Sequence, residues 1–361
     1  MNSRRNFIRQ SGLIAASSLL PFPSGAFVPQ RKLGVALAGL GYYSTDLLAP
    51  ALQQTQYCEL RGIITGSPEK IPVWQKRYNI PDTNVYNYEN MYRIADNGSI
   101  DVVYIVLPNG LHAQYSRIAA DAGKHVWCEK PMAMNARQCQ DIIDACERNK
   151  VKLSIGYRMQ HEPNTQKIIE WAASKPYGEI NDLIAQAGFY NSASDRGHWK
   201  LHPELGGGAM YDMGVYPLNA ARYATGMEPV AVTARHETTR PEIFDEVDET
   251  TIFELEFPGG VTATCKTSFG ESINRLEVNC EQGNYWLRPM QSYTGVSGGS
   301  SDGKILKPFG GNQQARQMDH DALAILDDKA VRVPGEEGLK DLRVVEAIFE
   351  SAGKNGVRVK L

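Results

Sequence analysis

The feature that most constrains this chain is a glycine-rich loop between an apolar strand and a helix. Residues 33–38 form a short apolar run, and Gly39, Gly41 and Ser44 follow it before leucines at helical spacing. In such a loop the first glycine allows a tight turn and the second lets backbone amides approach a pyrophosphate. The start of the following helix favours its negative charge. The spacing predicts a dinucleotide-binding loop, with Tyr42 and Tyr43 among its contacts.

Strands and helices alternate over the first half of the chain. The expected strands cover residues 33–38, 60–64, 101–107, 125–128 and 151–155. The expected helices cover residues 113–122 and 136–149. This alternation predicts a doubly wound parallel sheet of Rossmann type, in a first domain of residues 32–155.

The second half has a different pattern. Three segments alternate between apolar and polar residues and are rich in β-branched side chains: residues 250–257, 261–268 and 275–280. They predict a large, mainly antiparallel open sheet in a second domain, residues 156–361. Helices are expected at residues 208–225 and 339–352, each followed by glycine. The Gly/Ser-rich residues 294–311 are expected to form a mobile loop.

Composition excludes several classes of protein. The chain has 361 residues, 42% hydrophobic and 22% charged, as in a soluble globular protein with room for two cores. Its net charge is −3 without a Lys/Arg-rich block, which argues against nucleic-acid binding. No apolar run reaches the roughly 18 residues of a membrane span.

The six cysteines do not form a disulfide pattern. Cys139 and Cys146 fall on one expected helix, about 10 Å apart along its axis, which is too far for a bridge. None of the cysteines shows the spacing of metal ligands, so we expect buried thiols and no metal site.

The first residues read as an export signal. Arg4 and Arg5 form a twin-arginine pattern, residues 12–20 are modestly apolar, and Ser24 and Ala26 offer small residues at a cleavage site. We expect residues 1–26 to be a signal peptide and residues 27–31 a short arm. The export machinery would then be a partner, and the protein would reach the periplasm folded. The alternative is a basic amphipathic helix.

The end of the second strand distinguishes between two cofactors. NAD enzymes usually place a carboxylate there for the ribose hydroxyls. Here Thr65, Gly66 and Ser67 are followed by Lys70, which predicts a site for the 2′-phosphate of NADP rather than NAD. Glu69 is an ambiguity, although it falls four residues beyond Thr65. The alternative is that Lys70 is an ordinary solvated helix residue.

Two further segments carry candidate catalytic groups. Glu129 and Lys130 end a strand at the carboxyl edge of the sheet, where Lys130 faces the cleft and a nearby nicotinamide lowers its pKa. Asp212 and Tyr216 are four residues apart on one helix face, after a glycine run at residues 206–208 that lets a ligand approach. A neighbouring cation such as Lys130 is needed if Tyr216 is to act as a base near neutral pH.

Together these motifs resemble one family. The glycine loop, residues 108–112, residues 129–131, residues 156–158 and the Asp212/Tyr216 pair are similar to the family of glucose–fructose oxidoreductase, inositol dehydrogenase and MocA-type enzymes. The resemblance extends over essentially the whole mature chain and looks closest to the glucose–fructose oxidoreductase branch. It implies that Lys130, Asp212 and Tyr216 are catalytic. It also implies that a second group of residues builds the site or contacts the cofactor: Leu107, Pro108, Asn109, His112, Glu129 and Arg158.

The resemblance implies an NADP-dependent oxidation of an aldose at C1 to a lactone. Export further implies that the cofactor stays bound and that a second sugar re-oxidises it. The alternatives are a dehydrogenase or reductase with dissociable cofactor, a glycosidase that uses transient oxidation, and a non-enzymatic sugar-binding protein. The open sheet implies a homodimer or homotetramer.

Overall fold

The computed structural model describes residues 31–192 and 198–361. The twin-arginine pattern, the cleavage site and the arm up to residue 30 lie outside these ranges, so the expected signal peptide stays a prediction. Residues 32–361 form one unit built on two sheets. The two expected domains therefore pack together as a single contact unit.

The first sheet has six parallel strands in the order β3-β2-β1-β4-β5-β6. The strands are β1 (Leu33–Ala38), β2 (Cys58–Ile64), β3 (Val85–Tyr86), β4 (Val102–Ile105), β5 (His125–Cys128) and β6 (Leu153–Ile155). Because β1 is apolar and buried along its whole length, it takes a central place with neighbours on both sides. The strand order reverses between β1 and β4, which is where ligands bind in sheets of this kind. The predicted doubly wound sheet is confirmed.

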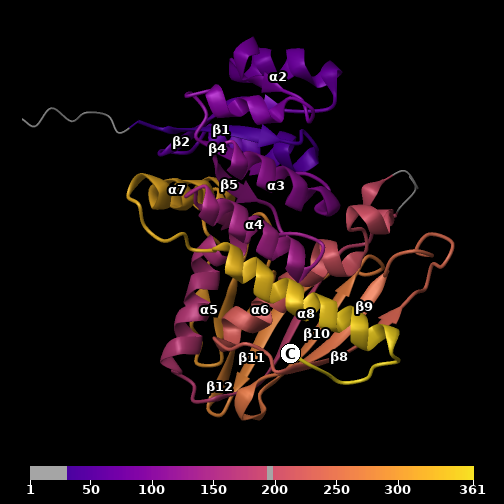
Figure 1. The fold of residues 1–361 in the computed structure, drawn as a ribbon. Helices are drawn as coiled ribbons and strands as arrows, with labels where there is room; N and C mark the ends of the chain where they lie inside the picture. The colour runs from indigo at the N-terminus through magenta and orange to yellow at the C-terminus, as the bar shows by residue number, and fades with distance from the viewer. Residues whose placement is uncertain (1–30, 193–197) are drawn as a thin grey trace, which may run out of the picture. The chain divides into compact units, whose positions relative to one another are not determined.

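Helices cover both faces of the first sheet (Figure 1). From the first half of the chain come the π-helical η1 (Tyr43–Leu48), α1 (Ala49–Leu52), α2 (Ile71–Tyr78), α3 (His112–Asp121) and α4 (Ala136–Arg148). A further helix, α7 (Gln313–Leu326), comes from the end of the chain and packs against α1, η1 and β2. Its Met318 and Ala322 share a buried cluster with Leu48 and Leu52. The first sheet is therefore completed by residues that are far away in the sequence.

The second sheet has nine strands in the order β14-β13-β12-β11-β7-β10-β9-β8-β15. The strands are β7 (Ile180–Gly188), β8 (Ala231–Glu237), β9 (Thr250–Glu256), β10 (Thr262–Ser268), β11 (Ile273–Cys280), β12 (Gly283–Leu287), β13 (Gly298–Ser300), β14 (Ile305–Leu306) and β15 (Val359–Lys360). Only β7 and β10 pair in parallel. The predicted, mainly antiparallel sheet is confirmed.

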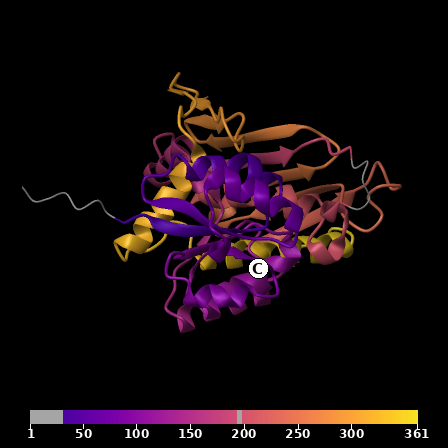
Figure 2. The ribbon, with the colours of Figure 1, turned by 90° about the horizontal axis from the view of Figure 1, so that it is seen from above.

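One face of this sheet carries α5 (Pro163–Ser174), α6 (Val215–Thr225) and α8 (Gly335–Gly353). Figures 1 and 2 show α8, in yellow, lying along the orange strands. On β7, Leu183 and Ala185 are buried, whereas Ile184 between them is only half-buried. This alternation means that the other face of the sheet is left uncovered by the helices of this chain.

The expected mobile loop at residues 294–311 was wrong in part, because it contains the hairpin of β13 and β14 at the edge of the second sheet. A side chain on Gly298 would put its Cβ 1.9 Å from the carbonyl oxygen of Trp286. The glycines that resemble a flexible loop therefore allow close pairing with β12.

Two expected helices differ in detail from the prediction. α8 begins at Gly335 rather than at residue 339, because Gly335 and Gly338 let its first turn lie against Ile143 and Met132. The expected helix at residues 208–225 is divided into a π-helical segment, η9 (Met210–Gly214), and α6. π-helical turns are rare and often occur at functional sites.

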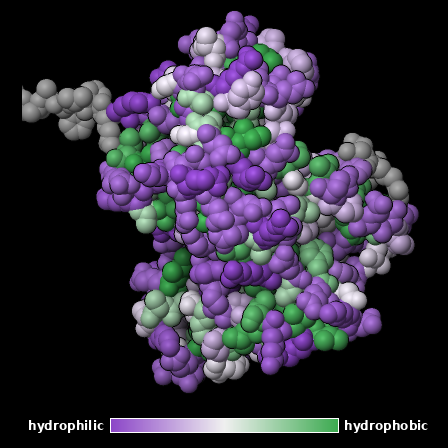
Figure 3. Space-filling model, viewed as in Figure 1, coloured by the Kyte–Doolittle hydropathy of each residue, from purple (hydrophilic) through white to green (hydrophobic). Residues whose placement is uncertain are grey.

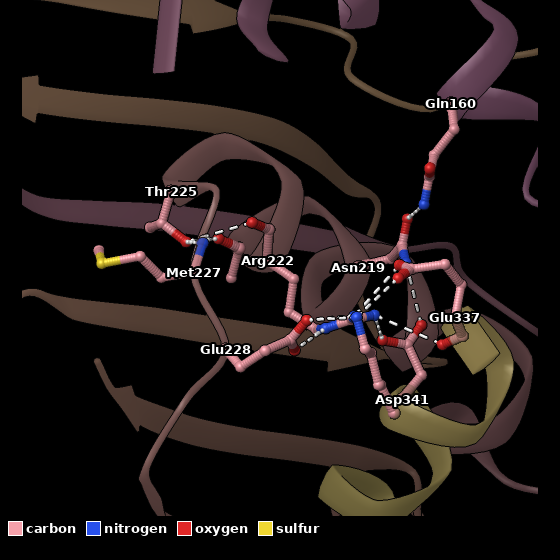
Figure 4. A network of polar contacts seen from close by, with 10 residues as sticks. Gln160, Asn219, Arg222, Thr225, Met227, Glu228, Glu337 and Asp341 are labelled. Carbon is pink, nitrogen blue, oxygen red and sulfur yellow. Dashed lines mark hydrogen bonds and ion pairs between the residues drawn. The ribbon is translucent and has the colours of Figure 1, made fainter. Parts of the chain in front are cut away.

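A buried ion network joins α6 to α8 (Figure 4). Arg222 on α6 is 4% exposed and pairs with Glu228, Glu337 and Asp341 at 2.6–3.1 Å. Asn219, one turn earlier on α6, also donates to Asp341. Asp341 itself is fully buried, so its charge depends on these partners.

The remaining expectations concern the surface and the thiols. The six cysteines, all within the described residues, are free. On the face shown in Figure 3, hydrophilic residues predominate and hydrophobic ones form small separate groups. Within residues 31–192 and 198–361, no helix has both the length and the hydrophobicity of a transmembrane span.

Candidate active site

The glycine loop packs against the protein at Gly39 and has open space beside Gly41. Gly39 has a φ of 95°, and a side chain there would place its Cβ 2.2 Å from the carbonyl oxygen of Val106. The Ser44 hydroxyl donates to the Gly39 carbonyl at 2.6 Å and fixes the turn. No described atom lies within 4 Å of a Cβ built on Gly41. The loop therefore fits a pyrophosphate, which the residues around Gly41 would hold through backbone amides.

The end of β2 lies beside this loop. The buried Thr65 hydroxyl accepts from the backbone amide of Ser67 at 3.0 Å. The Lys70 ammonium donates to the Leu40 carbonyl at 2.9 Å, which places it next to the glycine loop. The exposed residues at this edge are Gly41, Tyr42, Gly66, Pro68 and Glu69. The expected nucleotide contacts are thus gathered at one sheet edge.

The loop after β4 forms a rigid wall of the site. Asn109 is buried and donates to the Gly206 carbonyl at 2.8 Å. The His112 ring is fully buried, with its two nitrogens 2.8 and 2.9 Å from the carbonyl oxygens of Pro131 and Leu107. Burial lowers the pKa of His112 to about 4. His112 therefore joins two loops and has no polar atom left for the cofactor, while Leu107 and Pro108 are half-buried beside it.

A chain of two hydrogen bonds, from α7 and β4, holds the Glu129 carboxylate in place. The Tyr104 hydroxyl donates to its carboxylate at 2.7 Å, and Gln317 on α7 donates to that hydroxyl at 3.2 Å. Burial raises the pKa of Glu129. A side chain on Gly156 would place its Cβ 2.6 Å from the same carboxylate. The glycine of the 156–158 motif is therefore needed to make room for Glu129.

Lys130 brings the three expected catalytic residues together. Its ammonium donates to the Asp212 carbonyl at 2.8 Å and lies 4.5 Å from the centre of the Tyr216 ring. Burial acts to lower the pKa of Lys130, but Tyr216, Asp212 and Glu129 outweigh it and raise that pKa. The protein's own charges thus act against the expected lowering. The Lys130 ammonium therefore links the end of β5 in the first sheet to the η9 segment that carries Asp212.

Arg158 supports the site from behind. It is 2% exposed and donates to Gln313 Oε1 at 2.6 Å and to main-chain carbonyls of residues 291–292. Its guanidinium carbon lies 5.6 Å from the Tyr216 ring centre and 4.6 Å from that of Tyr293. Its two terminal nitrogens donate to protein groups, so Arg158 fixes the loop and adds positive charge near Tyr216.

The structure adds two residues to the site that the sequence did not indicate. The Tyr293 ring centre lies 5.8 Å from that of Tyr43 in the glycine loop, and burial raises the pKa of both hydroxyls. Lys200 pairs with the Asp212 carboxylate at 2.6 Å. Neither residue falls in a recognisable motif, because Lys200 lies in a short helical turn and Tyr293 in a loop of the second half.

The glycine run at residues 206–208 does not admit a ligand, contrary to expectation. Side chains there would place their Cβ atoms 2.6 Å from Asn109 Cβ, 2.5 Å from the Lys200 carbonyl oxygen and 2.2 Å from Asp248 Oδ1. Glycine is needed at residues 206–208 because the segments that carry Asn109, Lys200 and Asp248 pack against the backbone there.

Comparisons with known proteins agree with this architecture. Residues 33–157 match the sequence profile of an oxidoreductase family with an NAD-binding Rossmann fold. Residues 165–286 match the GFO/IDH/MocA C-terminal domain. The chain belongs to the Gfo/Idh/MocA family. This Gfo/Idh/MocA protein is an NAD(P)-dependent oxidoreductase that acts on CH–OH groups.

Three similar proteins cover most of this chain. D-xylose 1-dehydrogenase (NADP(+)) 2 of Haloferax volcanii is 30% identical over 90% of this Gfo/Idh/MocA chain and 97% of its own. D-xylose 1-dehydrogenase [NADP(+)] of Haloarcula marismortui is 27% identical over 88% of this chain and 90% of its own. The crystal structure of aldose-aldose oxidoreductase from Caulobacter crescentus, complexed with glycerol, is 38% identical with a TM-score of 0.87. It covers 92% of this chain and 100% of that one.

Proposed function

We propose that this enzyme oxidises the C1 hydroxyl of an aldose to a lactone with NADP. The observation that carries the proposal is the Lys130 ammonium, placed between the Asp212 carbonyl and the Tyr216 ring at the carboxyl edge of the first sheet. The similar proteins named as xylose dehydrogenases and aldose-aldose oxidoreductase support a sugar as substrate.

Tyr216 is the proton acceptor in this mechanism. It takes up the proton of the C1 hydroxyl, so that the C1–O bond becomes a carbonyl and the lactone forms. NADP, when bound, supplies the acceptor for the C1 hydride. Lys130 and Arg158, at 4.5 and 5.6 Å from the ring centre, stabilise the negative phenolate that this role requires. The main-chain carbonyl of Asp212 accepts a hydrogen bond from Lys130, and its carboxylate accepts one from a sugar hydroxyl.

NADP is favoured over NAD by the end of β2. Lys70 is placed beside the glycine loop, and the 64–68 segment carries hydroxyls without a carboxylate. A 2′-phosphate would meet a positive charge there. Lys70→Ala is expected to weaken NADP binding by roughly tenfold, about 1.4 kcal/mol, and NAD binding far less. Titration of each nucleotide measures this, and equal losses would contradict the choice of NADP.

A tightly held cofactor and a second sugar complete the proposal. An exported enzyme would have little free nucleotide available, so a second sugar takes up the hydride and a proton and restores the oxidised cofactor. The twin-arginine pattern and the similarity to an aldose-aldose oxidoreductase support this. Denaturing the purified mature protein should release NADP in a one-to-one ratio. An empty protein that binds added NADP reversibly would instead indicate a dehydrogenase with dissociable cofactor.

The open face of the second sheet supports a homodimer or a dimer of dimers. Ile184, Ile252 and Trp286 are half-buried on this face among polar residues. A second copy would remove their apolar surface from water. Light scattering should give two or four chains per particle, and a monomer would refute the assembly.

A further inference from the structure

Lys200 belongs to the active site although it lies outside every recognised motif. It lies in the short helix η7 (Trp199–Leu201), and its Nζ is 2.6 Å from Asp212 Oδ2. The two side chains are 23% and 13% exposed, so the ion pair is largely removed from water. An ion pair in that setting is less screened than a pair on the surface.

Aromatic rings surround the Lys200 ammonium. The ring of Phe189 lies 4.8 Å from it, and the rings of Trp199 and Phe269 lie 5.8 Å from it. The Phe189 and Phe269 rings also contact each other, with 5.2 Å between their centres. Rings at these distances attract a cation and restrict its movement. The ammonium is therefore held at one place next to Asp212.

The main chain of Lys200 is fixed to the same segment. Its carbonyl accepts from the Gly208 amide at 2.9 Å, and there is no room for a side chain at Gly207 against that carbonyl. Gly208 lies four residues before Asp212. Both the backbone and the side chain of Lys200 are thus attached to the loop and helix turn that carry Asp212.

We infer that Lys200 is a positioning residue of the active site, which holds the Asp212 carboxylate in place to accept a hydrogen bond from a sugar hydroxyl beside the reacting carbon. This role rests on the proposed function. Lys130 contacts the Asp212 carbonyl and Lys200 its carboxylate, so two cations from different segments fix one residue. The sugar is thereby selected for a hydroxyl that can reach Asp212.

The charges around Asp212 make this role measurable. Burial acts to raise the pKa of Asp212, but Lys200, Lys130 and His198 together hold it below its ordinary value. Asp212 also contributes to the raised pKa of Tyr293, so Tyr293 lies within electrostatic range of this carboxylate. Removal of the Lys200 charge raises the pKa of Asp212, so Asp212 stays protonated up to a higher pH. The acid limb of the kcat/KM profile for the sugar should then move to higher pH.

The test compares wild type with Lys200→Met and Lys200→Arg in the NADP-loaded enzyme. Lys200→Met should lower kcat/KM for the aldose by roughly 10- to 100-fold, as for a lost charge-assisted hydrogen bond, and move the acid limb upward. Lys200→Arg keeps the charge and should keep the limb in place. If Lys200→Met does not fold, Lys200→Gln removes the charge with less change in polarity.

Lys304→Met is the control for loss of a lysine–aspartate pair away from the site, although this pair is more exposed, at 52% and 45%. Lys304 also pairs with an aspartate, Asp302, at 2.7 Å and lies 5.1 Å from the centre of the Tyr177 ring, but it belongs to the β13–β14 hairpin. This variant should keep both kcat/KM and the pH profile of the wild type. A general effect of losing a lysine–aspartate ion pair would appear in both lysine variants.

Two outcomes separate the inference from the proposed function. If wild type oxidises aldoses and Lys200→Met keeps the wild-type acid limb, the role of Lys200 is overturned and the proposed function stands. If wild type oxidises no aldose, the proposed function fails and the role of Lys200 fails with it. An unmoved limb with uniformly reduced activity identifies Lys200 as merely structural.

Discussion

Two buried charge clusters of this molecule use the same residue types in different ways. Around Arg222, three carboxylates surround the guanidinium, and Lys340 completes the ion pairs at 3.0 and 3.1 Å. At the active site, the cations Lys130 and Arg158 face tyrosine rings and main-chain carbonyls instead. In the first cluster, carboxylates neutralise the charge of Arg222. In the second, the charges of Lys130 and Arg158 stay available to a negative group at Tyr216.

The difference shows what each cluster can do. A guanidinium paired with several carboxylates holds α6 against α8 and offers nothing to a ligand. In the active site the carboxylates Glu129 and Asp212 are fewer than the cations Lys130, Arg158 and Lys200. The excess positive charge stabilises a negative oxygen, which is first the Tyr216 phenolate and then the sugar oxygen that has given its proton to Tyr216. Each substitution below removes one group from one of these two clusters.

The largest effect is expected for Tyr216→Phe. The ring and its contacts with Lys130 remain, but the hydroxyl that accepts the proton is gone. The rate of sugar oxidation should fall by about 10²- to 10⁴-fold, the usual contribution of a positioned acid or base. Steady-state kinetics measures the rate, and an unchanged melting temperature shows that the fold is intact. Full activity in this variant would favour a sugar-binding or structural role for the tyrosine.

Arg222→Met should instead act on stability. It leaves Asp341 fully buried without its main partner, which costs about 3–5 kcal/mol of unfolding free energy. The kcat of the molecules that remain folded should change little, because Arg222 does not touch the site. Denaturant unfolding measures the loss. A stable but inactive variant would show that the two clusters are functionally coupled.

The smallest effect, and one of opposite sign, is expected for Glu129→Gln in the cofactor-free enzyme. Because burial raises the pKa of Glu129 in the folded state, ionisation of this group destabilises the fold as pH rises above its ordinary value of 4.5. The variant should be more stable than wild type near neutral pH and should match it at acid pH. Melting curves across pH measure this. A destabilised variant at neutral pH would mean that the charge of Glu129 supports the fold.

Much of the fold could be predicted because local pattern and burial agree there. The strand at residues 33–38 was predicted to the residue, and so was the strand at residues 125–128, since both are short apolar runs in a parallel sheet. The hairpin at Gly298 was missed because glycine there permits close pairing, whereas in the sequence it resembles a flexible loop. The packing of α7 on the first sheet could not be predicted, because no local pattern carries a contact between distant segments.

The site could be predicted as far as the motifs reach. Lys130, Asp212 and Tyr216 come together as expected, since the motifs that carry the family resemblance include all three. Lys200 and Tyr293 were missed because they lie in a short helical turn and in a loop, and tertiary packing sets the course of both. The resemblance placed His112 at the site or the cofactor, and burial with two backbone contacts gives it a role in building the site by joining loops.

The central claim is tested most directly by incubating the enzyme with a panel of aldoses and following product formation, in wild type and in Tyr216→Phe. The account predicts that wild type converts at least one aldose to its lactone, with one hydride transferred for each lactone formed. It predicts that Tyr216→Phe, although folded and able to bind NADP, forms lactone at least about a hundred times more slowly. Wild type that binds NADP and oxidises no aldose, or a variant as active as wild type, would contradict the account.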